Sequence, residues 1–273
     1  MPDPSTAPPT LSQRLKRLFA PLLVALAAAG KWILLGLKFG LPFIKMGGSM
    51  IVALVFYSMA FGWQFALGFI LLLFIHEMGH VIAARYVGLK VSLPLFIPFM
   101  GAVIMLREMP RNAWIESIIG IGGPLLGSLG ALAASSCYFF TGNQLFLALG
   151  YTGLFLNLFN LVPIVPLDGG RIVSAISPWL WVLGLAILVP YLIYRAIQGS
   201  LLNGAVSFII ILIVLTSLPR VLALFRRRTP AQLRYFECTP SQRIIMALLY
   251  FSLIATLYLG MGFIKNLMPR GSF

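Results

Sequence analysis

Long apolar segments separated by short polar or basic stretches form the main pattern of this chain. Six segments approach the roughly 20 residues that an α-helix needs to cross the hydrocarbon core of a bilayer. They cover residues 48–62, 64–87, 113–139, 143–165, 179–197 and one of two further stretches, 202–219 and 244–264, both of which could span. Backbone polar groups in lipid must be satisfied within each segment. The pattern therefore predicts an all-α polytopic membrane protein with about six transmembrane helices.

Two stretches depart from this pattern. Residues 11–45 are apolar but carry Lys31, Lys38 and Lys45 at intervals of seven, or about two helical turns, which predicts an interfacial helix lying on anionic lipid. Part of it, 18–30, could still dip into the bilayer. Residues 91–108 contain two prolines and a glycine among β-forming side chains, which argues against a plain helix.

Composition agrees with a membrane protein, since 60% of the 273 residues are hydrophobic and 10% are charged, with a mean hydropathy of +0.99. Twenty Lys and Arg against six Asp and Glu give a net charge of +14. The basic residues flank apolar segments and form no patch interleaved with aromatic side chains, so we expect anionic lipids as partners and no nucleic acid. Six arginines fall within 220–243, which predicts that this loop is cytoplasmic.

Both histidines of the chain lie in one pentapeptide, His76-Glu77-Met78-Gly79-His80. On a helix, positions i and i+4 share a face, so the two imidazoles can bind one zinc ion while Glu77 acts as general base on metal-activated water. No charged residue lies between Lys45 and Glu77, and an ionisable group at membrane depth indicates a functional site. The alternative, a buried histidine in an interhelical hydrogen bond, explains this spacing less well.

A third zinc ligand is required, and neither a third histidine nor a suitably placed cysteine is present. Asp168 is the candidate, because it follows a proline-broken stretch, 160–167, and precedes Gly169 and Gly170, which let the backbone approach closely. Irregular backbone at membrane depth is tolerated where it lines a wet cavity or is buried in protein. The alternative is that Asp168 only caps a following helix over 169–177.

These motifs resemble the site-2 protease family of intramembrane zinc metalloproteases, peptidase family M50. The resemblance rests on HEMGH (76–80), on NLVPIVPLDGGR (160–171) and on Gly122-Gly123-Pro124, and it covers most of 48–177. It implies one zinc ion per chain bound by His76, His80 and Asp168, with Glu77 as catalytic base.

The resemblance also implies that Asn160 orients the substrate or stabilises the oxyanion. Asn157, one turn earlier, is expected only to pack, and the spacing of Gly123 and Gly127 is explained by helix packing. For 91–108 the resemblance implies a membrane-associated β-hairpin or re-entrant loop. A sheet edge could hold an extended substrate, whereas an ordinary re-entrant loop would shield the site.

The resulting hypothesis is a multi-pass zinc endopeptidase, located in the cell membrane, that cleaves transmembrane segments of other proteins, with its zinc site nearer the cytoplasmic face. We divide the chain into a disordered tail (1–10), a basic interfacial helix (11–45), a catalytic membrane core (46–178) and additional transmembrane helices with a basic cytoplasmic loop (179–273). The alternative is a catalytically silent zinc-binding protein of the same fold, acting as a transporter or chaperone. The oligomeric state stays open.

Overall fold

The computed structural model describes residues 40–97, 101–199, 205–227 and 229–268. The tail predicted over 1–10 and most of the interfacial helix predicted over 11–45 lie outside these residues. The chain forms two units, 1–47 and 48–273. Of the first unit only 40–47 is described, and it is helical. All contacts described below are made within the second unit.

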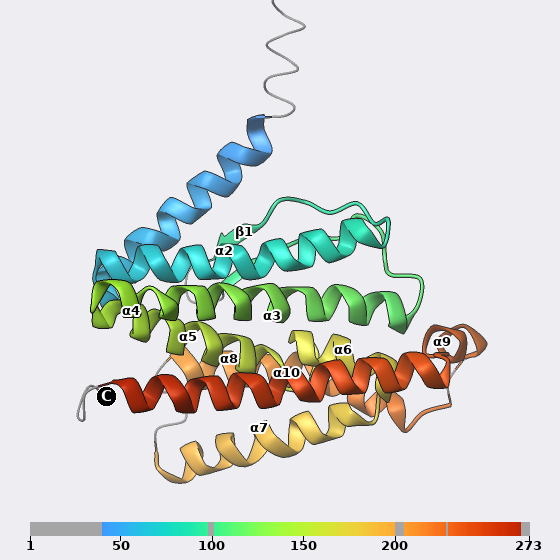
Figure 1. The fold of residues 1–273 in the computed structure, drawn as a ribbon. Helices are drawn as coiled ribbons and strands as arrows, with labels where there is room; N and C mark the ends of the chain where they lie inside the picture. Colours follow the sequence, from blue (N-terminus) through green and yellow to red (C-terminus); the bar gives the residue numbers. More distant parts are fainter. Residues whose placement is uncertain (1–39, 98–100, 200–204, 228, 269–273) are drawn as a thin grey trace, which may run out of the picture. The chain divides into compact units, whose positions relative to one another are not determined.

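Helices account for most of the described chain (Figure 1). They are the helix Gly40–Phe61, α2 (Trp63–Tyr86), α3 (Ala113–Ser136), α4 (Tyr138–Thr141), α5 (Gln144–Asn160), α6 (Asp168–Ile176), α7 (Leu180–Ile197), α8 (Ala205–Leu224), α9 (Pro230–Tyr235) and α10 (Pro240–Leu267).

Six stretches of the described residues are helical, long and apolar enough to cross a membrane, which confirms the predicted number. They are Gly40–Phe61, Trp63–Tyr86, Ala113–Thr141, Leu180–Ile197, Ser207–Leu224 and Pro240–Leu267. One of the predicted segments is not among these six helices. The stretch 143–165 yields only the 17-residue α5, which ends at Asn160, because prolines follow at 163 and 166 and lack the backbone N–H that a helix requires. Both C-terminal candidates qualify instead of one.

Helix α3 lies at the centre of the second unit, where it packs against α2, α5 and α6, and α10 packs across α5 and α6. Glycines permit the closest of these approaches. A Cβ atom added at Gly79 of α2 would lie 2.1 Å from the carbonyl oxygen of Gly122 in α3, so the two helices meet with their backbones in contact. Small residues allow this form of packing, which van der Waals contact stabilises in lipid.

The stretch between α2 and α3 contains two paired strands, as expected for a β-hairpin within 91–108. Strands β1 (Leu95–Ile97) and β2 (Gly101–Val103) pair antiparallel, with Phe96 opposite Ala102. The backbone N–H of Phe96 donates to the hydroxyl of Ser49, 3.0 Å away, and so points away from β2. β2 lies next to α2, the helix that carries the HEMGH motif.

Candidate metal centre

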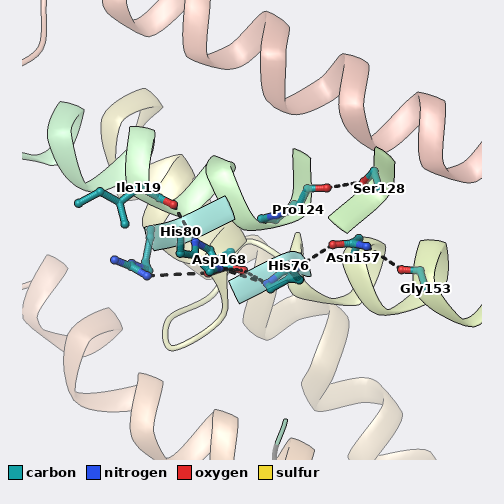
Figure 2. Close-up of polar contacts among 9 residues, drawn as sticks. His76, His80, Ile119, Pro124, Ser128, Gly153, Asn157 and Asp168 are labelled. Carbon is teal, nitrogen blue, oxygen red and sulfur yellow. Dashed lines mark hydrogen bonds and ion pairs between the residues drawn. The ribbon is translucent and has the colours of Figure 1, made fainter. Parts of the chain in front are cut away.

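Three buried side chains from two helices converge on one point (Figure 2). The Nε2 atoms of His76 and His80 lie 3.1 Å apart, and the Oδ2 atom of Asp168 lies 3.2 Å from the first and 3.1 Å from the second. The exposed fractions are 3% for each histidine and 8% for the aspartate. The structure therefore brings together the three residues that the sequence analysis selected as metal ligands.

The second nitrogen of each imidazole is held by an oxygen atom. Nδ1 of His76 lies 2.7 Å from Oδ1 of Asn157, and Nδ1 of His80 lies 2.7 Å from the carbonyl oxygen of Ile119. A carbonyl oxygen only accepts hydrogen bonds, so Nδ1 donates in both rings and Nε2 keeps its lone pair. This tautomer is the one required for metal binding through Nε2.

The orientation of the Asn157 amide is fixed as well. Its Nδ2 atom donates to the carbonyl oxygen of Gly153, 2.7 Å away, which directs Oδ1 toward His76. The expectation that Asn157 only packs was therefore wrong. Its position in an apolar helix could have indicated a role, because a buried amide in lipid requires a specific partner. The identity of that partner depends on how α5 lies against α2.

Asp168 reaches the histidines because the chain turns sharply after α5. A Cβ atom at Gly169 would lie 2.2 Å from the carbonyl oxygen of Leu161, so only glycine permits this close approach of α6 to the preceding loop. Asp168 is the first residue of α6, and the N-cap residue is Leu167. The alternative assignment of Asp168 as a helix cap is excluded, since its carboxylate faces the two imidazoles instead.

Two glycines of α3 leave room for the polar side chains of the site. A Cβ atom at Gly123 would lie 2.2 Å from Nε2 of His80, and one at Gly127 would lie 2.5 Å from Oδ1 of Asn157. From the sequence, both glycines were expected only to allow helix packing. Their absent side chains also create the space that His80 and Asn157 occupy.

The geometry fits a metal ion. The three atoms form a nearly equilateral triangle with sides of 3.1–3.2 Å. In a tetrahedral zinc site with bonds of roughly 2.0–2.1 Å, neighbouring ligand atoms lie roughly 3.3 Å apart. Two neutral imidazoles and one carboxylate in a buried site are also a donor set that catalytic zinc uses. The site could therefore hold one metal ion.

The two residues expected to act in catalysis, Glu77 and Asn160, differ in their position relative to the metal site. Glu77 follows His76 directly in α2 and is 7% exposed, so its carboxyl belongs to the same buried region. Asn160 is the last residue of α5 and is partly buried. Among the described residues, the hydrogen-bond partners of the histidines and Asp168 do not include Asn160. Its role stays a prediction.

Part of this chain is similar to known zinc metalloproteases and to their family model. The model of peptidase family M50 matches residues 64–151 and 136–181. A zinc metalloprotease of Methanocaldococcus jannaschii is 37% identical over 107 residues, which make up 37% of this chain and 31% of that protein. A Synechocystis protein named as a zinc metalloprotease is 30% identical over 167 residues, covering 53% of this chain and 44% of the relative.

A solved structure, the site-2 protease from Methanocaldococcus jannaschii, matches 62% of this chain and 85% of its own length, with 24% identity and a TM-score of 0.46. The chain spans less than half the length of the two curated relatives. The family match covers α2 to the start of α7, so every residue of the candidate metal centre lies inside it.

Proposed function

The chain belongs, through residues 64–181, to peptidase family M50, and on that premise we propose that it is an intramembrane zinc endopeptidase of the site-2 protease type. Its substrates would be transmembrane segments of other membrane proteins. The observation that carries the proposal is the buried triangle of His76, His80 and Asp168, held between helices apolar enough to span a membrane. A hydrolytic site among membrane-spanning helices would suit a substrate that also lies in the membrane.

His76, His80 and Asp168 would hold one zinc ion per chain. When bound, zinc would supply a Lewis acid that activates water and polarises the scissile carbonyl. Glu77 would accept the proton from the attacking water and deliver it to the departing amine, which avoids expelling an unprotonated amide nitrogen. Asn160, at the end of α5, would donate from its amide to the substrate or to the oxyanion.

The β-hairpin supports an extended mode of substrate binding. The peptide bonds of a transmembrane helix are internally hydrogen-bonded, so the substrate must unwind locally before hydrolysis. An unwound strand in lipid needs new partners for its backbone groups. The edge of β2 would supply them by strand addition, next to the helix that carries Glu77.

We also propose that the chain is an integral protein of the cell membrane with its metal centre nearer the cytoplasmic face. The basic residues support this orientation, because the dense arginine cluster of 220–243 and the basic residues that follow α2 fall on the side expected to face the cytoplasm. The same loops would contact anionic lipid headgroups.

The central experiment compares purified wild-type protein with Glu77→Gln in liposomes that contain candidate transmembrane substrates. The variant retains the size of the side chain but cannot accept a proton, so cleavage should fall about 100- to 10,000-fold. Zinc content should stay near one ion per chain. Glu108→Gln is the matched control, since Glu108 is exposed in the loop after the hairpin.

Cleavage by Glu77→Gln near the wild-type rate would contradict the assignment of the base. Stoichiometric zinc retained in both His76→Ala and His80→Ala would contradict the metal site. Zinc binding by the wild type without cleavage of any tested transmembrane substrate would favour the alternative, a silent zinc-binding protein. Retention of Glu77 beside a complete set of ligands supports the enzyme instead.

A further inference from the structure

One short segment of the C-terminal part of the chain, beyond the family match, makes polar and aromatic contacts to α6, the helix that carries Asp168, and to residues next to it. We name residues 235–243 the C-terminal clamp; they comprise the end of α9, the connecting turn and the start of α10. Three separate contacts join this segment to α6 or to residues that contact α6. None of the residues of the clamp is a proposed metal ligand or catalytic residue.

The first contact reaches Asp168 through two intermediate side chains. The hydroxyl of Tyr235 donates to Oε2 of Glu116, 2.6 Å away. The other oxygen of Glu116 lies 3.8 Å from Nε of Arg171, and Nη1 of Arg171 lies 3.9 Å from Oδ1 of Asp168. Asp168 thus presents Oδ2 to the histidines and Oδ1 to Arg171. The positive charge of Arg171 therefore favours the rotation of the carboxylate in which Oδ1 faces Arg171 and Oδ2 faces the histidines.

The phenol of Tyr235 is suited to this role. Burial, together with the nearby negative charge of Glu116, raises the pKa of Tyr235 well above its usual value. The hydroxyl therefore stays protonated at physiological pH and remains a donor. Its bond to a charged acceptor is of the stronger kind of hydrogen bond.

The second contact holds the opposite end of α6. The guanidinium of Arg243 donates to the carbonyl oxygen of Ile176, the last residue of α6, and to that of Phe236, 3.1 Å away. One side chain therefore satisfies a carbonyl that a helix end leaves without an internal partner and ties it to the turn after α9.

The third contact approaches the first turn of α6. The indole N–H of Trp181 donates to the carbonyl oxygen of Gly170, 2.8 Å away, and the ring of Trp181 meets that of Phe236 edge to face, with centroids 6.0 Å apart. The clamp thus acts on both ends of a nine-residue helix. A helix this short has little rigidity of its own in isolation and depends on its packing.

We propose that the C-terminal clamp is a positioning element that fixes the orientation of Asp168 toward His76 and His80. Tyr235 of the clamp acts through Glu116 on Arg171 of α6, so Tyr235 and Arg171 are the positioning residues, and of the two only Tyr235 lies outside the family match. This inference rests on the proposed zinc site and adds a role for residues outside the family match. Partners of metal ligands commonly determine metal affinity, because they hold the ligand in the geometry that the metal requires.

The test measures zinc affinity by competition with a chromophoric chelator, in full-length detergent-solubilised protein. Arg171→Gln should weaken zinc binding roughly tenfold, and Tyr235→Phe, which acts through two further groups, about threefold. Arg171→Lys keeps the positive charge and should restore affinity to within about threefold of the wild type. Tyr258→Phe is the matched control, because Tyr258 is an exposed tyrosine of α10.

A second measurement separates positioning from packing. Cobalt substituted for zinc reports ligand geometry through its visible absorption, so the spectra of Arg171→Gln and Tyr235→Phe should shift while that of Tyr258→Phe does not. Unchanged zinc affinity and unchanged spectra in both variants, beside a wild type that binds zinc, would overturn this inference alone. So would a lower thermal midpoint of the metal-free variants with unaltered spectra. A wild type that binds no zinc would overturn the proposed function together with this inference.

Discussion

The imidazoles of His76 and His80 offer their lone pairs at Nε2 because oxygen atoms accept from Nδ1. For His76 that oxygen belongs to a side chain and can be removed. Asn157→Ala should weaken zinc binding about 10- to 100-fold, since the ring loses both its orientation and its preferred tautomer. Zinc content after dialysis against graded chelator measures the effect.

Thr256→Ala provides the comparison for Asn157→Ala. Thr256 is an exposed residue of α10 whose hydroxyl donates to the carbonyl oxygen of Ser252, so its removal deletes one polar group of a membrane helix away from the site. We expect wild-type zinc binding from this control. Equal affinities in the two variants would show that the Asn157 contact does not orient the ligand.

Gly123 tests the space beneath His80. Gly123→Ala places a methyl group where Nε2 of His80 now lies, since the added Cβ would be 2.2 Å from that atom. The imidazole must then leave its present position, in which Nε2 lies 3.1 Å from Asp168, and bound zinc should fall by more than about tenfold. Gly262→Ala is the matched control, because a Cβ at Gly262 of α10 would meet no atom within 4 Å.

Should Gly123→Ala unfold the protein, the helical content measured by circular dichroism will reveal it. Folded Gly123→Ala protein that keeps stoichiometric zinc would contradict the assigned packing of His80 on α3. Overpacking of this kind commonly costs roughly 1–3 kcal/mol, which a membrane bundle with several packed helices can tolerate.

At the scale of elements, the register of the β-hairpin shows which backbone N–H groups point away from the partner strand. Phe96 directs its N–H away from β2, toward Ser49. Two residues opposite each other in an antiparallel pair direct their N–H groups either both toward or both away from the partner strand, so the N–H of Ala102 also points outward, along the edge of β2 that faces away from β1. If a substrate strand adds to this edge, it will accept a hydrogen bond from Ala102.

Ala102→Pro removes that donor without removing a hydrogen bond between the two strands. We expect the KM for a transmembrane substrate to rise roughly threefold to tenfold, corresponding to one lost hydrogen bond, while zinc binding stays unchanged. Ala102→Val retains the N–H and favours a strand, so it should cleave like the wild type. An unaltered KM in Ala102→Pro would argue that substrates do not pair with β2.

At the scale of the whole molecule, the contacts of the C-terminal clamp bring residues that are far apart in the sequence to the same end of the second unit. Tyr235 reaches Glu116 near the start of α3, and Arg243 reaches Ile176 at the end of α6. The basic loop before α10 therefore lies on the same side as the end of the bundle that carries α6. Its arginines should place this end in the cytoplasm.

Cysteine labelling with a membrane-impermeant reagent tests this orientation in a background that lacks Cys137 and Cys238. Arg227→Cys should react only after the cytoplasmic face is made accessible, and Gln144→Cys, at the start of α5, should react in intact cells. Both positions are exposed in the structure. Reaction of Arg227→Cys in intact cells would invert the protein and place the metal centre nearer the opposite face.

The amino-acid sequence alone determined those features that depend on neighbours along the chain. The apolar segments predicted the number of spanning helices, and prolines at 163 and 166 predicted a break before Asp168. The spacing of His76 and His80 placed both imidazoles on one face of the helix, because four residues amount to about one helical turn whatever surrounds the helix. Local geometry and the cost of unpaired backbone groups in lipid are sufficient for these conclusions.

The tertiary structure decided what depends on residues far apart in the sequence. Ile119 is 39 positions from His80, Asn157 is 81 from His76, and Glu116 is 119 from Tyr235. Such pairs meet only when helices pack with a particular rotation and axial shift, and apolar periodicity leaves both undetermined. For this reason the sequence could select Asp168 as a ligand but could not identify Asn157 as the partner of His76, or the residues that hold α6 in place.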